Sequence, residues 1–220
     1  QLESTGDYFA FEMADESLFC IKGRDGVIRT FYNVCQHRAH QLVTDKGSTR
    51  VIVCPYHAWT YELTGGLRAA PNAKSVEGFD TSNICLTEVR TEVFLGFIFV
   101  NLDTDAKSME QWFPNARAEL ESFVPNWAEL KPLEWVEIPE DCNWKVSVEN
   151  YSECYHCSLN HPTFATGVIK PETYDIQPQG FCLRHTTESG PLDQMSYDIN
   201  SGFENNEKYS SWFLWPMFSF

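Results

Sequence analysis

Cysteine and histidine occur together in two short segments of the first half of the chain. Cys35 and His37 are separated by one residue, and Cys54 and His57 are separated by two. Each segment therefore offers one thiolate and one imidazole, the ligand types that zinc and iron–sulfur centres prefer. Each segment also follows an expected strand, so the ends of two hairpins could hold one centre between them. The spacing predicts a single metal site built from both segments.

The mixed ligand pairs distinguish two kinds of metal site. Zinc fingers usually pair like ligands within a loop, Cys with Cys and His with His. A Rieske [2Fe–2S] centre takes two Cys on one iron and two His on the other, which one Cys and one His per loop can provide. The two segments, and residues 58–67 after them, resemble the Rieske domains of ring-hydroxylating oxygenases. The resemblance implies that Cys35, His37, Cys54 and His57 bind a [2Fe–2S] cluster, and a zinc site is the alternative.

These loops differ from those of respiratory Rieske proteins, which carry an additional Cys in each loop and join the two by a disulfide. His40 and Tyr56 stand at these positions, so the resemblance implies that this disulfide is absent. Trp59 stands where the respiratory proteins place a serine hydroxyl near a cluster sulfide. Hydrogen bonds to cluster sulfur raise the reduction potential. We therefore expect a low potential, suited to giving electrons to an iron that activates O₂.

A second group of possible metal ligands, Glu153, His156 and His161, lies in the second half of the chain. We expect a helix over 144–155, on which Glu153 and His156 share one face because they are three residues apart. A regular helix would turn His161 away, but a π-type widening, or a break before Pro162, could return it. Two imidazoles and a carboxylate with open positions form the iron site of non-haem Fe(II) oxygenases.

The segment around these residues is similar to the iron-binding motif of Rieske oxygenase catalytic domains. The resemblance implies that His156 and His161 bind a mononuclear iron, and that Glu153 bridges this site to a Rieske histidine of the neighbouring subunit in a trimer. Direct ligation of iron by Glu153 is the alternative. Cys154 and Cys157 are expected to be neighbours of the site with no redox or zinc role. The third ligand, a carboxylate, is expected beyond residue 220, because the available acids do not stand where the family places it: Glu172, Asp175, Asp193 and Asp198.

The residue at the bridging position bears on the substrate. Most Rieske oxygenases have Asp there. The Glu at position 153 resembles the subgroup that acts on quaternary ammonium compounds such as carnitine, glycine betaine and stachydrine, which has Glu at this position. Aromatic side chains near the end of the chain could form a cation–π wall for a trimethylammonium group. Most of them are nevertheless expected to pack in the core of a sheet: Tyr209, Trp212, Phe213, Trp215 and Phe218. His40 and His185 are expected to be structural or to face solvent.

The elements that position these groups divide the chain in two. Residues 1–107 are expected to form an all-β Rieske domain, because short apolar runs alternate with turn signals. The expected strands lie within 8–11, 28–32, 51–53 and 93–100. Residues 108–220 are expected to begin with an amphipathic helix over 108–124, ended by Pro125. By resemblance they belong to a helix-grip catalytic domain that is incomplete at its C-terminal end, so the expected fold class is α+β.

Composition excludes several classes of protein. Sixteen Lys and Arg against 31 Asp and Glu give a net charge of −15, which makes nucleic acid and anionic membranes poor partners and suits a cationic small molecule. No apolar run approaches the roughly 20 residues that span a bilayer, and the pattern of a signal peptide is missing. Eight cysteines spread over 220 residues favour metal binding in a reducing compartment over a disulfide scaffold. We expect a bacterial cytoplasmic protein, and a fragment of a longer chain.

Together these features predict the oxygenase component of a Rieske system. A separate reductase would pass electrons from NAD(P)H through the cluster to the mononuclear Fe(II) of an adjacent subunit. Hydroxylation of a C–H bond beside nitrogen would then lead to C–N cleavage. The alternatives are a Rieske oxygenase that acts on an aromatic ring or another small organic substrate, a Rieske electron carrier without mononuclear iron, and a zinc-binding interaction module.

Overall fold

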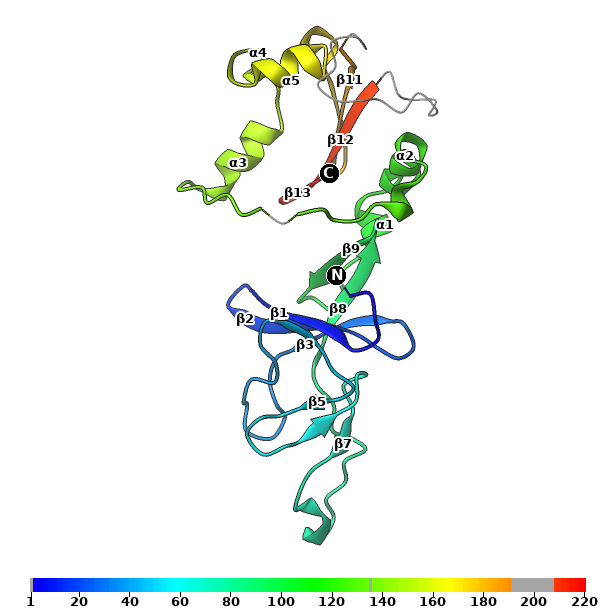
Figure 1. The fold of residues 1–220 in the computed structure, drawn as a ribbon, viewed down its shortest axis with the longest axis vertical. Helices are drawn as coiled ribbons and strands as arrows, with labels where there is room; N and C mark the ends of the chain where they lie inside the picture. The colour runs from blue at the N-terminus through cyan, green and yellow to red at the C-terminus, as the bar shows by residue number, and fades with distance from the viewer. Residues whose placement is uncertain (1, 135, 191–207) are drawn as a thin grey trace. The chain divides into compact units, whose positions relative to one another are not determined.

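The computed structural model describes residues 2–134, 136–190 and 208–220 of the chain. The chain divides into two compact units, Gln1–Ala106 and Lys107–Phe220. Figure 1 labels their helices and strands. No helix within the described ranges is long and apolar enough to cross a lipid bilayer. Asp193 and Asp198, which the sequence offers as possible acids, lie outside these ranges.

An antiparallel sheet of six strands forms the larger part of the first unit, in the order β4-β1-β2-β3-β8-β9. Its strands are β1 (Asp7–Met13), β2 (Glu16–Lys22), β3 (Ile28–Tyr32), β4 (Lys46–Ser48), β8 (Glu88–Phe94) and β9 (Phe97–Asn101). Ala14 and Asp15 join β1 to β2 with positive φ angles of 50° and 64°. Two consecutive residues of positive φ form the turn type that suits the right-handed twist of a hairpin. The expected strand over 28–32 is confirmed.

The apolar run over 93–100 forms two strands, which corrects the expectation of a single buried strand. Leu95 and Gly96 lie between β8 and β9 with φ angles of 51° and 79°. Phe94 pairs with Phe97 across this two-residue turn. Because the glycine accepts positive φ without steric cost, the run reverses in its middle. Val93 and Phe97 are consequently about half exposed, at 48% and 45%.

A smaller three-stranded sheet, in the order β5-β6-β7, completes the first unit. Its strands are β5 (Ile52–Val53), β6 (Thr60–Tyr61) and β7 (Leu67–Ala69). One buried cluster joins the two sheets and includes two of the candidate ligands: Phe19, Ile21, Phe31, Cys35, Leu42, Ile52, Cys54, Tyr61, Leu63, Leu67 and Leu86. The two cysteines are therefore anchored in the hydrophobic core, which fixes the loops that they begin.

The second unit places short helices before and around a four-stranded antiparallel sheet, in the order β10-β11-β12-β13. Its strands are β10 (Asp175–Gln179), β11 (Cys182–Glu188), β12 (Lys208–Leu214) and β13 (Phe218–Ser219). Its helices are α1 (Met109–Trp112), α2 (Ala116–Phe123), α3 (Trp144–Tyr151), α4 (Cys157–Asn160) and α5 (Pro162–Gly167). Short 3₁₀ turns cover Trp127–Glu129 and Pro171–Thr173, and a third lies in the first unit at Ala73–Ser75. The expected α+β class is confirmed.

The helix expected over 108–124 is split into α1 and α2. Ser108 caps α1 through its side chain, as the capping-box sequence indicates. Pro114 lies between the two helices and lacks the N–H that a continuous helix would need. Asn115 then begins α2 with a φ of 72°. The two helices still present an apolar side to the core, since Phe113, Ala116 and Leu120 are all buried.

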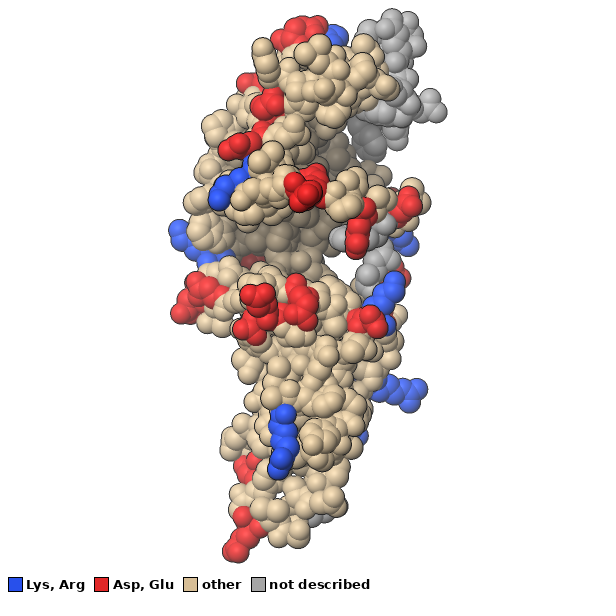
Figure 2. All heavy atoms as spheres, turned by 90° about the vertical axis from the view of Figure 1, so that its left-hand side faces the viewer, with Lys and Arg blue, Asp and Glu red and all other residues tan. Residues whose placement is uncertain are grey.

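Charged side chains are spread over the face of the molecule that Figure 2 shows. On the face drawn in Figure 2, Asp and Glu side chains are interspersed with Lys and Arg, and they are not gathered into one patch. The net charge of −15 therefore acts on this face as a distributed field, without a single strongly acidic site.

Candidate iron–sulfur and iron sites

The two Cys–His loops of the first unit share one backbone conformation. The N–H of Cys35 donates to the carbonyl of His40 at 2.9 Å, and the N–H of Cys54 donates to the carbonyl of Trp59 at 2.8 Å. The alanine four residues after each Cys donates its N–H back to the Cys carbonyl, at 3.0 and 2.9 Å. Both alanines have positive φ, 55° and 56°. Each loop is thus closed at its base by the same pair of hydrogen bonds.

Burial divides the four candidate ligands into two kinds. Cys35 and Cys54 are each 2% exposed, whereas His37 and His57 are exposed. The two imidazole rings come together with centroids 4.8 Å apart. A Rieske cluster needs this division, because one iron takes two thiolates and the other takes two imidazoles. The residues fit a [2Fe–2S] group with a buried thiolate side and a histidine side at the surface.

His37 is held in place by an aromatic neighbour. Trp59 stacks on its ring with centroids 4.8 Å apart and planes only 7° from parallel. Both histidines and Trp59 line a hollow of about 650 Å³ that also includes Gln36 and Phe79. The pKa of His57 is lowered, first by partial desolvation and then by His37 and two further basic neighbours. Both imidazoles are thus exposed on the surface of the first unit.

Tyr61 contacts a candidate cluster ligand and was not singled out in the sequence. Its side chain is fully buried, and its hydroxyl lies 3.2 Å from Sγ of Cys35. The N–H of Gln36 donates to the same hydroxyl oxygen at 3.0 Å. A hydroxyl therefore lies beside the cysteine side of the site, although no serine stands at position 59. The signal was available in the sequence, since a tyrosine follows the second loop directly, but the contact joins residues 26 positions apart.

The second group of ligands lies in a turn and not on a long helix. The helix expected over 144–155 ends at Tyr151, and α4 begins at Cys157. Glu153 and His156 therefore lie between α3 and α4, which corrects the expectation that they share a helix face. His161 ends α4 directly before Pro162, so the expected break, and not a π-type widening, is what the structure has. The rings of His156 and His161 lie with centroids 5.1 Å apart.

Glu153 contacts His156 directly. Its carboxylate oxygen Oε1 lies 2.5 Å from Nδ1 of His156, and its other oxygen accepts a hydrogen bond from the N–H of Tyr155. The hydrogen bond to His156 holds the pKa of the Glu153 carboxyl below its ordinary value. A carboxylate on one ring nitrogen leaves the other nitrogen of the imidazole for a metal. This arrangement favours an orienting role for Glu153 over direct ligation.

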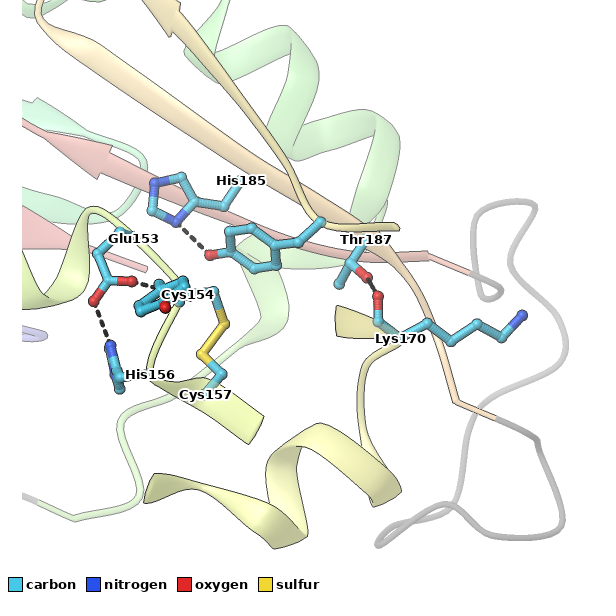
Figure 3. Close-up of a disulfide and its surroundings, with 9 residues drawn as sticks. Glu153, Cys154, His156, Cys157, Lys170, His185 and Thr187 are labelled. Atoms are coloured by element: carbon cyan, nitrogen blue, oxygen red, sulfur yellow. Dashed lines mark hydrogen bonds and ion pairs between the residues drawn. A yellow bond between two sulfur atoms is a disulfide. The ribbon is translucent and has the colours of Figure 1, made fainter. Parts of the chain in front are cut away.

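A disulfide joins Cys154 to Cys157, which the sequence did not predict (Figure 3). The turn between α3 and α4 brings their Cα atoms to 5.0 Å, within the range that a disulfide requires. The bond therefore closes the turn that carries Glu153 and His156. The free cysteines are Cys20, Cys35, Cys54, Cys85, Cys142 and Cys182.

Among the described residues, no three His, Cys, Asp or Glu side chains gather around a position for one metal ion. The cluster does not require such a group, because each of its irons takes two protein ligands. At the second site two imidazoles meet, and the described acids Glu172 and Asp175 do not complete a group of three with them.

Two of the five aromatic residues that were expected to pack mostly in the core of a sheet are buried, and the other three are partly or largely exposed. Trp212 and Phe213 are 2% and 4% exposed, as expected for core residues of a sheet. The indole N–H of Trp212 donates to Glu119 at 3.1 Å, and its ring stacks on Phe220. Trp215 is 47% exposed, and Tyr209 and Phe218 are partly exposed. Trp212 and Phe213 therefore contribute to packing and leave little ring surface for a cation.

Comparison with known proteins identifies both units by family. Residues 1–80 match the Rieske [2Fe–2S] domain, and residues 127–212 match the catalytic domain of the ring-hydroxylating alpha subunit. The chain is 36% identical over 217 residues to the carnitine monooxygenase oxygenase subunit of Escherichia coli K12, which covers 98% of this chain and 57% of that protein. It is 33% identical over 178 residues to the glycine betaine monooxygenase oxygenase subunit of Chromohalobacter salexigens, over 80% of this chain and 39% of that protein.

Solved structures agree with these relatives. The crystal structure of the quaternary ammonium Rieske monooxygenase CntA with L-carnitine matches 100% of this chain and 57% of that chain, with a TM-score of 0.82 and 32% identity. Naphthalene 1,2-dioxygenase with indole bound matches 85% of this chain and 46% of that chain, with a TM-score of 0.68 and 27% identity. This chain thus spans a little over half the length of the carnitine monooxygenase subunits that it matches. It belongs to the Rieske-type oxygenases, with a Rieske [2Fe–2S] domain followed by sequence of the catalytic domain of ring-hydroxylating alpha subunits.

Proposed function

We propose that this chain belongs to the oxygenase component of a Rieske monooxygenase that hydroxylates a small quaternary ammonium substrate and thereby cleaves a C–N bond. The observation that carries the proposal is the presence of two distinct ligand sets in one chain. The first unit has two loops that each provide one Cys and one His, which makes four ligands. The second unit has His156 and His161, and the carboxylate of Glu153 binds His156. An electron carrier would need only the first set.

Each ligand has a defined role in this proposal. Cys35 and Cys54 hold the buried iron of the cluster, and His37 and His57 hold the outer iron. Residues 1–107 form the cluster domain, and residues 108–220 belong to the catalytic domain. His156 and His161 hold the mononuclear iron, whose third ligand is a carboxylate beyond residue 220. When bound, the cluster supplies electrons singly and the mononuclear iron supplies the site at which O₂ is activated.

Residues of this chain orient and protect these groups. The buried thiolate side excludes water from Cys35 and Cys54, while the exposed histidines leave a path for electrons. Glu153 fixes the ring of His156 by accepting from Nδ1. In a trimer of such subunits, the same carboxylate would connect His156 to a cluster histidine of the neighbouring subunit. A solved structure of a relative is described in terms of inter-subunit electron transfer, which supports this part of the proposal.

The remaining partners follow from the chemistry. A separate reductase would deliver electrons from NAD(P)H, and we infer a bacterial cytoplasmic location because that cofactor is available there. The substrate class rests on relatives named for carnitine and glycine betaine, and on structures with carnitine and γ-butyrobetaine bound. An aromatic substrate is the second candidate, because a 2-aminobenzenesulfonate 2,3-dioxygenase subunit is 35% identical over 178 residues.

Single-turnover oxidation tests the proposal without a reductase. The full-length protein is reduced anaerobically, freed of reductant and mixed with O₂ and one candidate substrate. We expect carnitine, γ-butyrobetaine or glycine betaine to give an amine and an aldehyde in amounts matching the mononuclear iron. Product from 2-aminobenzenesulfonate alone would establish the aromatic alternative. A reducible cluster with no product from any of the four would reject the proposed substrate class.

A further inference from the structure

His185 is a buried histidine with only one of its ring nitrogens engaged. It lies on β11 and is 1% exposed. Its Nδ1 lies 2.8 Å from the hydroxyl of Tyr174. Its Nε2 is buried and has no hydrogen-bond partner among the described residues. A buried polar nitrogen left unpaired is energetically costly, so such a group calls for an explanation.

The contact with Tyr174 determines which nitrogen carries the proton. Burial lowers the pKa of His185, so its ring is neutral and has one N–H. Burial also raises the pKa of Tyr174 far above its ordinary value, so the hydroxyl keeps its proton. That hydroxyl has no other hydrogen-bond acceptor among the described residues, so we assign it as donor to Nδ1. The proton of the imidazole then lies on Nε2, which becomes an unpaired donor.

Two neighbours on the same strand differ in this respect. Nε of Arg184, one residue earlier on β11, is likewise buried without a hydrogen-bond partner among the described residues, whereas the hydroxyl of Thr187 is paired. Thr187, two residues along β11, faces the same side of the sheet as His185. It is 3% exposed, and its hydroxyl contacts the hydroxyl of Thr173 and the carbonyl of Lys170, each at 2.8 Å. Figure 3 shows both side chains along β11. The packing therefore satisfies Thr187 fully and leaves His185 with one donor available.

The ring of His185 lies beside the end of α3, two residues before Glu153. Tyr151, the last residue of α3, stacks on the ring of His185 with centroids 5.5 Å apart. Glu153 follows two residues later, and its charge contributes to the raised pKa of Tyr174. Figure 3 places His185, Glu153 and His156 in one region of the second unit.

We propose that His185 is a substrate-binding residue whose Nε2–H donates a hydrogen bond to the carboxylate of a small quaternary ammonium acid. A carboxylate needs a donor, and a buried neutral imidazole provides one without adding a positive charge. Lys or Arg at this position would repel the trimethylammonium end of the same short molecule. This inference rests on the proposed function and specifies how that site would recognise the acid end of its substrate.

Two matched ligands separate this role from a structural one. γ-Butyrobetaine carries a carboxylate, and butyltrimethylammonium has the same cationic head and chain without it. Binding of each to the full-length, iron-loaded enzyme is measured by calorimetry under anaerobic conditions. We expect His185→Phe to weaken γ-butyrobetaine roughly 10- to 100-fold, the value of a hydrogen bond to a charged group, and to change butyltrimethylammonium by less than about twofold.

Further variants keep the test decisive. His185→Gln retains an N–H donor, so we expect it to recover part of the affinity for γ-butyrobetaine. Thr187→Val removes a buried hydroxyl from the same face and should not discriminate between the two ligands. Equal weakening of both ligands in His185→Phe and His185→Gln, or unchanged affinity for both, would overturn the inference. Wild-type enzyme that binds neither ligand while its cluster and iron are intact would instead reject the proposed substrate class, and the role of His185 with it.

Discussion

The hydroxyl of Tyr61 lies 3.2 Å from Sγ of Cys35, on the buried side of the cluster loops. Because the same hydroxyl oxygen accepts a hydrogen bond from the N–H of Gln36, its own proton is free to point at the sulfur. The pKa of Tyr61 is raised by burial and by Cys35, so the hydroxyl keeps that proton. The contact therefore supplies the thiolate with a hydrogen-bond donor.

Tyr61→Phe should lower the reduction potential of the cluster while the cluster remains bound. The donor stabilises the more negative, reduced cluster more than the oxidised one. A contact worth about 1.4 kcal/mol corresponds to about 59 mV in a one-electron couple, so we expect a decrease on the order of 60 mV. The potential is measured by redox titration of the visible spectrum. Tyr8→Phe, the same change elsewhere in the first unit, is the control, and equal shifts in both variants would contradict a specific role for Tyr61.

Substitution of a ligand in one set should remove only the metal that this set binds, because the two sets lie in different units. Cys54→Ala removes a buried thiolate, so we expect loss of the visible absorption of the cluster. His156→Ala should keep that absorption and lose the mononuclear iron. Spectra and iron analysis of the two full-length variants give the answer directly. Loss of the cluster spectrum in His156→Ala would show that the sites have been assigned wrongly.

Removing the disulfide of the second unit should cost modest stability. The bond between Cys154 and Cys157 closes a loop of only four residues, for which chain entropy gives roughly 2 kcal/mol. We expect the double variant Cys154→Ser/Cys157→Ser to lower the free energy of unfolding by about that amount in denaturant. Adding a reductant should have the same effect on the wild type and none on the variant. An effect of reductant on the variant would point to one of the other cysteines.

Those elements of the fold that depend on residues within one short segment could be predicted from the sequence. The strand over 28–32 follows from an apolar run bounded by turn signals, and the helix expected from residue 108 begins one residue later, at Met109. The prediction of one helix over 108–124 was wrong. The apolar residues recur at helical spacing on both sides of Pro114, and this periodicity does not reveal that the proline divides the segment into two helices. The prediction of one strand over 93–100 was wrong. Within this apolar segment a single glycine is the only residue that indicates a turn.

Contacts between distant segments could not be read in this way. The ligands Cys35 and Cys54 are recognisable by spacing, but the hydroxyl of Tyr61 beneath them depends on how β6 packs under the first loop. His185 was expected to be structural or to face solvent, and its partner Tyr174 comes from the segment before β10. The disulfide between Cys154 and Cys157 depends on the end of α3, which lies four residues earlier than expected.

Glu153 should be essential for turnover and dispensable for binding iron. In the structure it accepts from Nδ1 of His156, which is the contact of an orienting residue. Glu153→Ala should therefore keep a reducible cluster and most of its mononuclear iron, yet lose nearly all product in a single turnover. Glu153→Asp, with a shorter arm, should recover some product. Loss of the mononuclear iron in Glu153→Ala would instead make Glu153 a ligand, and normal turnover would remove both roles.

The metal content of the protein tests the central claim most directly. The full-length protein, purified anaerobically, is analysed for iron, zinc and acid-labile sulfide, and its visible spectrum is recorded before and after reduction. We expect about three irons and two sulfides per chain, in a red-brown protein whose colour bleaches on reduction, since each chain would hold one [2Fe–2S] cluster and one further iron. Zinc without labile sulfide, in a colourless protein, would contradict the assignment of both sites.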